Sequence, residues 1–320
     1  MAWYFVAFIF LFSCLLLSWL SSRLIKSLVD IAKYLHWKEF IIAFFIMAFA
    51  VSLPNLFVDL NAVLQHKPQI AFGDIIGGNL VDLTLILAIS AFFSKKGLSA
   101  KNEVVQQSAI FTAAIAVLPL FLILDSKLDR MDGLVLILVF VFYTWWIFSK
   151  KERFTKTYNG KNQNLIKDFK SFLKNILKIV VLLLLLLAAS QAVVSSAQFF
   201  SDKLNISLAL VGILIVGLGN AFPEAYFSIV SARKEENYLV LGDLMGSVIV
   251  CTTLVLGIIA LLSPFEIKDL SPFLTARIFL IVAALFSLLF IRTGKKITKK
   301  EGLFLLFIYI LFLLVEVFIA

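Results

Sequence analysis

Apolar runs about as long as a bilayer-spanning helix, roughly 20 residues, recur along the whole chain. Lipid offers no hydrogen-bond partners to an exposed backbone, so such runs must form helices and not open sheets. Only 15% of the 320 residues are charged, and the mean hydropathy is +1.02. A soluble domain of this size needs far more polar surface. The sequence therefore predicts an all-α membrane protein.

The pattern of apolar runs predicts ten transmembrane helices. They are expected at residues 2–20, 39–64, 70–93, 104–124, 133–149, 175–199, 207–232, 239–262, 273–291 and 302–319. The first run lacks the basic start and the small-residue cleavage site of a signal peptide, so we interpret it as a mature helix. Both cysteines, Cys14 and Cys251, lie inside apolar runs, which indicates no disulfide framework.

The net charge of +9 has two explanations, which are binding to nucleic acid and unequal placement of charge across a membrane. Of the 29 Lys and Arg residues, 22 fall in one alternate set of loops and 6 in the other. Basic residues concentrate in cytoplasmic loops. The bias therefore favours an integral, multi-pass membrane protein with both termini outside and no nucleic-acid partner. Its partners are expected to be inorganic cations and the lipid bilayer, while protein partners stay unknown from the sequence.

The sequence repeats itself at a constant offset of 169 residues. Pro54 aligns with Pro223, and residues 73–77 align with residues 242–246. Chance similarity between apolar helices would not place Pro, Gly and Asp at one offset. Each repeat holds five predicted spans, and an odd number inverts the second copy in the membrane, a plan common among transporters.

This repeat predicts the organisation of the chain as ten transmembrane helices in two inverted five-helix repeats. The first half is expected at residues 1–149 and the second at 175–320. The basic segment 150–174 between them is interpreted as a solvated cytoplasmic linker, with contact to lipid headgroups as the alternative.

Ionisable and polar side chains gather in the second and third spans of each half. A charge at the bilayer centre costs roughly 3 kcal/mol or more, so such residues mark candidate sites. The two repeat prolines should each break a helix and free carbonyls that can face a cation, although such prolines can also be purely structural. Ser52, Asn55 and Asp59 share a helical face at the first break, and Glu224 follows the second.

The third span of each half adds further polar groups on one face. Gly78 and Asp82 are four residues apart, as are Ser247 and Cys251. Asp82 and Glu224 come from different repeats and together supply a charge of −2. With neutral oxygens around them, they suit one Ca²⁺ or two monovalent cations. Both histidines lie elsewhere, so a transition metal fits less well, and no resident cofactor is expected.

Asp74 and Asp243 lie near the predicted starts of their spans. There a carboxylate can cap backbone N–H groups, or it can line an ion path, and the sequence leaves both interpretations open. The glycines four residues apart in these spans can likewise serve close helix packing alone.

At these residues the chain resembles the sodium/calcium exchanger superfamily, in its prokaryotic ten-helix form. The family's two α-repeats read G-T/S-S-x-P-E in one helix and G-N-x-x-G-S-N-x-x-N/D in the next. The corresponding segments here are residues 50–55 and 73–82, then 219–224 and 242–251. The likeness covers nearly the whole chain. It implies a prokaryotic cell membrane and alternating-access antiport of Ca²⁺, or a related cation, for Na⁺ or H⁺.

The resemblance also implies where cations bind. Our predicted set of cation ligands is Ser52, Asn55, Asp59, Gly78, Asp82, Asn220, Glu224, Ser247 and Cys251. The resemblance implies all of these positions except Asp59, and it implies Ala221 in addition. Asn55 stands where the family has Glu, and Cys251 where it often has Asp or Asn. Asp59 lies one turn from Asn55 and is expected to supply part of the missing charge.

Two other hypotheses compete with antiport. The altered ligands also fit a non-transporting relative that keeps the fold for structural or regulatory binding. An intramembrane enzyme is the weakest alternative, because the sequence holds no metal-ligand spacing, nucleophile elbow or His/carboxylate pair.

Overall fold

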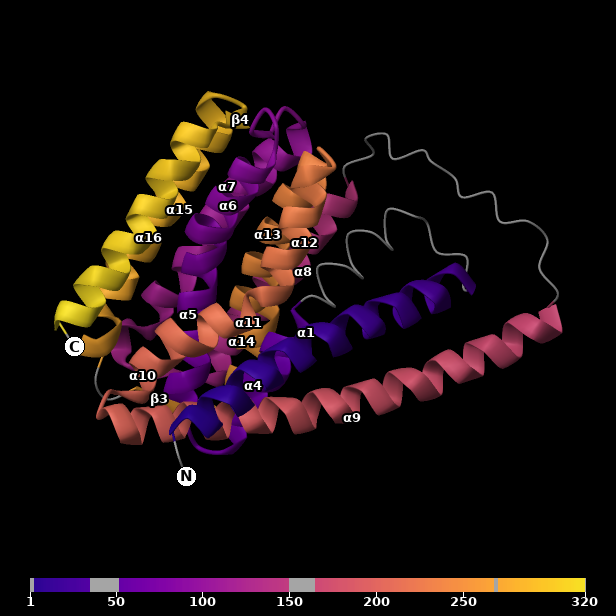
Figure 1. Cartoon of the computed structure of the whole chain (residues 1–320), viewed down its shortest axis with the longest axis horizontal. Coiled ribbons are helices and arrows are strands. Elements are labelled where there is room, and N and C mark those ends of the chain that lie inside the picture. Colours follow the sequence, from indigo (N-terminus) through magenta and orange to yellow (C-terminus); the bar gives the residue numbers. More distant parts are fainter. Residues whose placement is uncertain (1–2, 35–51, 150–164, 268–269, 320) are drawn as a thin grey trace.

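The computed structural model describes residues 3–34, 52–149, 165–267 and 270–319. Within them the chain is helical apart from short turns and four strands of two residues each (Figure 1). The helices of the first half are α1 (Trp3–Tyr34), α4 (Leu53–Leu64), α5 (Pro68–Val81), the π-helix η2 (Asp82–Ile86), α6 (Leu87–Phe93), α7 (Glu103–Leu122), the 3₁₀ turn η3 (Ile123–Asp125) and α8 (Arg130–Ser149).

The helices of the second half are α9 (Leu165–Leu204), α10 (Leu208–Val211), the π-helix η4 (Gly212–Val216), α11 (Gly217–Asn220), α12 (Phe222–Arg233), α13 (Asn237–Ile249), the π-helix η5 (Val250–Val255), α14 (Leu256–Leu262), the 3₁₀ turn η6 (Ser271–Phe273), α15 (Leu274–Thr293) and α16 (Lys299–Ile319). The second half adds α10, η4 and α11 before α12, where residues 35–51 of the first half lie outside the described part. The π-helices η2 and η5 occupy nearly equivalent positions of the two repeats.

Seven helices of the described residues are long and apolar enough to cross a membrane, and eight if the bent pair Leu208–Asn220 and Phe222–Arg233 is one span. Helix α4 is a shorter apolar helix, and the predicted start of its span at residues 39–51 lies outside the described residues. The total of ten spans therefore stays a prediction.

Two helices are longer than their apolar runs predict. Helix α1 continues past residue 20 to Tyr34, and α9 has 40 residues instead of the 25 expected between 175 and 199. The predicted linker 150–174 therefore overlaps the first turns of α9, and its residues 150–164 lie outside the described part. Lysines at positions 167, 170, 174 and 178 recur at helical spacing between apolar residues. This amphipathic pattern extends a helix beyond the run that hydropathy alone detects.

Helices α1 and α9 pack side by side across the rest of the bundle (Figure 1). The ring centroids of Phe10 and Phe200 lie 5.9 Å apart at this interface. Helix α9 also contacts α4, where the Asn61 side chain donates a hydrogen bond to the Leu187 carbonyl at 3.3 Å. The Asn61 amide further donates to the Ser190 hydroxyl. The long pair is thus attached to the bundle by polar as well as apolar contacts.

Two antiparallel ladders close opposite ends of the bundle. β1 (Leu98–Ser99) pairs with β4 (Lys296–Ile297), and β2 (Lys127–Leu128) pairs with β3 (Phe265–Glu266). Helix α7 runs from one ladder to the other, which places them at opposite ends. In each ladder, two loops that the charge pattern places on the same side of the membrane meet in space. The turn after α12 joins the β1/β4 end, because Glu235 accepts a hydrogen bond from the Lys95 backbone N–H at 2.7 Å.

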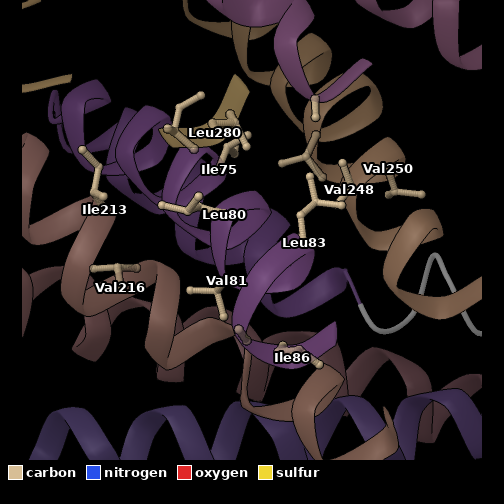
Figure 2. Packing of buried hydrophobic residues seen from close by; sticks show 14 of the residues in the cluster. Ile75, Leu80, Val81, Leu83, Ile86, Ile213, Val216, Val248, Val250 and Leu280 are labelled. Atoms are coloured by element: carbon tan, nitrogen blue, oxygen red, sulfur yellow. The ribbon is translucent and has the colours of Figure 1, made fainter. Parts of the chain in front are cut away.

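The two halves meet where α5 and η2 pass between helices of the second half. Figure 2 shows this packing for Leu80 and Leu83 of the first half, and Val216 and Val248 of the second. The crossing of α5 with α10 and η4 is very close because glycines line it. A Cβ added at Gly73 would lie only 2.7 Å from the Ala209 carbonyl oxygen. Small residues of this kind let membrane helices approach backbone to backbone.

Candidate functional site

The repeat prolines start helices at the centre of the bundle. Pro54 lies in the first turn of α4, and Pro223 in the first turn of α12. Between α11 and α12 the chain bends by 40° at Ala221. A proline is tolerated in a first turn because the N–H groups there lack helical partners anyway. The predicted break is confirmed in the second half, whereas the residues before Ser52 lie outside the described part.

Asp82 and Glu224 come from different halves and meet at Ser247. The Ser247 hydroxyl donates a hydrogen bond to Glu224 Oε1 at 3.4 Å and also bonds to Asp82. Asp82 is 4% exposed and Glu224 is 1% exposed, and the two carboxyl groups interact electrostatically. Two like charges buried this close repel each other unless a cation or a proton intervenes.

Asn55 and Cys251 form the equivalent contact on the other side of the repeat axis. The Asn55 amide donates to Cys251 Sγ at 3.3 Å, and Ser52 also bonds to this sulfur. The offset of 169 residues relates Asn55 to Glu224 and Cys251 to Asp82. Exchanging the halves therefore turns one contact into the other. One of the two equivalent positions holds two carboxylates and the other holds none.

Asp59 and Asn220 belong to a second group, together with Asp74. The carboxyl groups of Asp59 and Asp74 face each other within hydrogen-bonding distance. The Asn220 amide donates to Asp74 Oδ2 at 2.6 Å. The structure thus separates Asp59 and Asn220, which lie around Asp74, from the two central contacts at Ser247 and at Cys251.

Neither Asp74 nor Asp243 caps a helix, so that interpretation is wrong. The N-cap residues are Lys67 for α5 and Glu236 for α13, and both aspartates lie about two turns further on. The spans begin earlier than the hydropathy predicts, which moves these carboxylates into the membrane interior. Asp243 interacts electrostatically with Glu224.

Two further positions complete the centre. Gly78 contributes no side chain, and an added Cβ would meet no described atom within 4 Å. Asn79 was not in the predicted set, but its amide donates to the Thr252 hydroxyl at 2.7 Å and ties α5 to η5. Its place in the repeat motif, directly after Gly78, was the signal for this contact.

Many buried oxygens of the site receive no hydrogen bond from the residues that the structure describes. They are Asn55 Oδ1, both oxygens of Asp59, Asp74 Oδ1, Asp82 Oδ1, Asn220 Oδ1, Glu224 Oε2 and both oxygens of Asp243. Every one of these atoms is an acceptor, and a buried acceptor without a donor is costly. A cation is the partner that satisfies several such oxygens at once.

The donor set is that of a hard cation. Among the described residues, no three His, Cys, Asp or Glu side chains form a group that could hold a metal ion by themselves. An ion here must therefore take neutral amide, hydroxyl, carbonyl or water oxygens beside the carboxylates. Oxygen ligands of this kind suit alkali and alkaline-earth cations rather than transition metals.

A protein-family model described as sodium/calcium exchanger protein matches residues 5–149 and 174–318, which together are most of the chain. This chain belongs to the sodium/calcium exchanger family. The two matched segments begin and end 169 residues apart, the offset of the internal repeat. The family consists of membrane transporters and not of enzymes, so the chain is an integral, multi-pass membrane protein.

Curated relatives match most of the length of the chain. The chain is 25% identical over 335 residues to the sodium/calcium exchanger MaX1 of Methanosarcina acetivorans, covering 93% of this chain and 95% of that protein. It is 24% identical to the inner membrane protein YrbG of Escherichia coli strain K12, covering 91% of this chain and 90% of the relative.

The fold also resembles a solved exchanger. A structure of the sodium-calcium exchanger NCX_Mj has a TM-score of 0.65 and 22% identity, and the match covers 96% of both chains. At this identity the likeness concerns the fold, and it confirms the predicted fold class of an all-α, exchanger-like membrane protein.

Proposed function

We propose that this chain is a secondary active antiporter that exchanges Ca²⁺, or a related cation, for Na⁺ or H⁺ by alternating access. The observation that carries the proposal is the meeting of Asp82 and Glu224. These two buried carboxylates come from opposite halves, contact one hydroxyl and keep oxygens that no described group satisfies. A cation is the ligand that such a pair lacks.

Charge and ligand type support a divalent ion. Asp82 and Glu224 neutralise a charge of +2, and Ser247 with the broken-helix backbone near Ala221 adds neutral oxygens. Ca²⁺ takes six to eight oxygens in a flexible shell, so waters complete the set. The name of the relative MaX1, a sodium/calcium exchanger, supports the same pair of ions.

A non-transporting relative is not favoured. That hypothesis rests on the replacements at Asn55 and Cys251, which remove charge from one of two equivalent positions. The other position keeps both of its carboxylates, in contact with Ser247. Half of the central site is therefore intact.

A flux assay on the purified, reconstituted chain tests the proposal. Proteoliposomes loaded with Na⁺, or buffered to an outward proton gradient, are expected to take up ⁴⁵Ca²⁺ only while the gradient lasts. Dissipating the gradient with an ionophore should stop the uptake. Uptake that is independent of every Na⁺, K⁺ and H⁺ gradient, from protein that is monodisperse before reconstitution, would contradict antiport.

The orientation of the chain is part of the proposal. We propose that the two halves, 1–149 and 175–320, are inverted, with the β1/β4 end in the cytoplasm of a prokaryotic cell and both termini outside. The loops that meet at the β1/β4 end belong to the more basic set, and basic loops stay in the cytoplasm.

Single-cysteine labelling tests this orientation. A membrane-impermeant maleimide on intact cells is expected to label Lys127→Cys, at the β2/β3 end, and to spare Lys96→Cys, at the β1/β4 end. Both positions are exposed, whereas the native Cys14 and Cys251 are buried and should stay unlabelled. Permeabilised cells, in which both variants should react, are the control. The reverse pattern on intact cells would overturn the proposed orientation.

A further inference from the structure

The hairpin of α4 and α5 places two carboxylates side by side on one side of the central site. Asp59 lies six residues before Gln65, the C-cap residue of α4, and Asp74 lies six residues after Pro68, the first residue of α5. In antiparallel helices, equal distances from the connecting turn mean equal depth, about 9 Å here. The two side chains accordingly face each other. The register of the hairpin, and not a chance rotamer, produces the contact.

The pair is closed off from solvent and lacks donors. Asp59 is 0% exposed and Asp74 is 2% exposed. Neither oxygen of Asp59 receives an N–H or O–H hydrogen bond from the described residues, and Asp74 receives one, from Asn220. Two buried carboxylates cannot both stay ionised at this distance without a positive charge between them.

Asn220 gives the pair a third oxygen. Its amide N–H₂ is used on Asp74, while its carbonyl oxygen is buried and has no partner among the described residues. The side chain therefore lies against the carboxylates with a free acceptor. Two carboxylates and an amide oxygen are the oxygen donors that a hard divalent cation takes, with waters completing the shell.

We propose that Asp59, Asp74 and Asn220 form a second binding site for a hard divalent cation, distinct from the Asp82–Glu224 pair. The proposal extends the proposed antiport function and depends on it for its role in transport. Asp74 and Asp82 are eight residues apart along the continuous helix of α5 and η2, about 12 Å. That spacing is enough to separate two ions. The second site would then lie on the ion path between the Asp82–Glu224 pair and the turn at residues 65–67.

The site has no full counterpart in the other half. The repeat offset relates Asp74 to Asp243 but Asp59 to Ser228, so the second half has one carboxylate where the first has two. The second binding site therefore exists only on the side of the molecule that holds the β2/β3 ladder.

Counting bound ions tests the second site separately from transport. Equilibrium dialysis of the purified full chain against ⁴⁵Ca²⁺ is expected to give two Ca²⁺ per wild-type chain at saturation. The double variant Asp59→Asn/Asp74→Asn should bind one, Glu224→Gln should also bind one, and the combined triple variant should bind none. Competing Na⁺ in a parallel dialysis tells whether the second site also takes a monovalent cation.

Two controls keep the result interpretable. Glu316→Gln removes another buried carboxylate, in α16 and outside both groups, and should still bind two Ca²⁺. Should the double variant fail to stay monodisperse, Asn220→Ala keeps both carboxylates and is expected to weaken the second binding step about tenfold.

A wild-type count of one bound Ca²⁺, or an unchanged count in the double variant, overturns the second site and identifies Asp59 and Asp74 as a proton-sharing pair only. A wild-type chain that binds two Ca²⁺ but shows no gradient-driven flux would refute antiport and leave the second site standing.

Discussion

Glu224→Gln is expected to reduce gradient-driven ⁴⁵Ca²⁺ flux in proteoliposomes roughly 100-fold or more. The change keeps the size of the side chain and removes one of the two charges that face each other across the repeat interface. The variant loses its contact with the bound cation, and removing one partner from a buried pair of opposite charges costs about 3–5 kcal/mol. Each 1.4 kcal/mol is a factor of ten in affinity, so uptake at low Ca²⁺ should fall towards the background of empty vesicles.

The control for this experiment is again Glu316→Gln, which takes a carboxylate from α16 and is expected to transport like the wild type. Asp82→Asn, at the other member of the pair, should match the loss seen for Glu224→Gln. If both variants of the pair keep wild-type flux, with equal amounts of protein in the vesicles, the central site proposed here does not carry the ion.

The meeting of Asp82 with Glu224 could be predicted because it follows from symmetry. A constant offset between two copies, together with an odd number of spans, places equivalent helices around one axis. Near that axis the third span of one repeat meets the second span of the other, so Asp82 lies beside Glu224 although the two are not equivalent positions. The contact of Asn55 with Cys251 is the same inference applied to the opposite pair of helices.

The pairing of Asp59 with Asp74 depends on a different kind of information. The sequence predicts that Asp59 acts together with Asn55, which lies one turn away on the same helix. The structure pairs it instead across the hairpin, since α5 starts at Pro68 and its depth is counted from there. An error of two residues in a helix start shifts the expected depth by about 3 Å. Helix ends are what hydropathy locates least well, so this pair was missed.

The lengths of α1 and α9 were missed for a related reason. An apolar run ends at the first charged residues, whereas the helix itself continues as long as its polar side chains contact water or a favourable neighbouring side chain. Arg23 lies over the Trp19 ring at 5.1 Å, beyond the predicted end of the first span. A charge resting on an aromatic ring of the preceding turn stabilises the continued helix instead of ending it. The two-residue strands are too short for any sequence pattern to reveal.

Gly77→Ala is expected to destabilise the folded protein by about 3 kcal/mol or more, seen as a large fall in the melting temperature in detergent. An added Cβ would lie 2.8 Å from both the carbonyl carbon and the Cα of Ile213, and nearer still to its oxygen. These are backbone atoms of η4, and they cannot rotate away. Gly212 beside them is held as closely by Ile70. The helices would have to separate.

Gly302→Ala is the matched control, because the same methyl group would lie 3.2 Å from the Ala91 side chain and 3.4 Å from the Ala88 carbonyl oxygen. Alanine is favoured over glycine inside a helix by up to about 1 kcal/mol, so this variant should melt at or above the wild-type temperature. Equal melting temperatures of the Gly77 variant and the wild type would contradict the close crossing.

The close crossing at Gly77 also bears on function. Gly78, next to Gly77, lies against Gly217, and α5 leads directly to Asp82 while η4 leads through α11 to Glu224. The backbone contact at Gly77 therefore fixes how far apart the two halves hold their carboxylates.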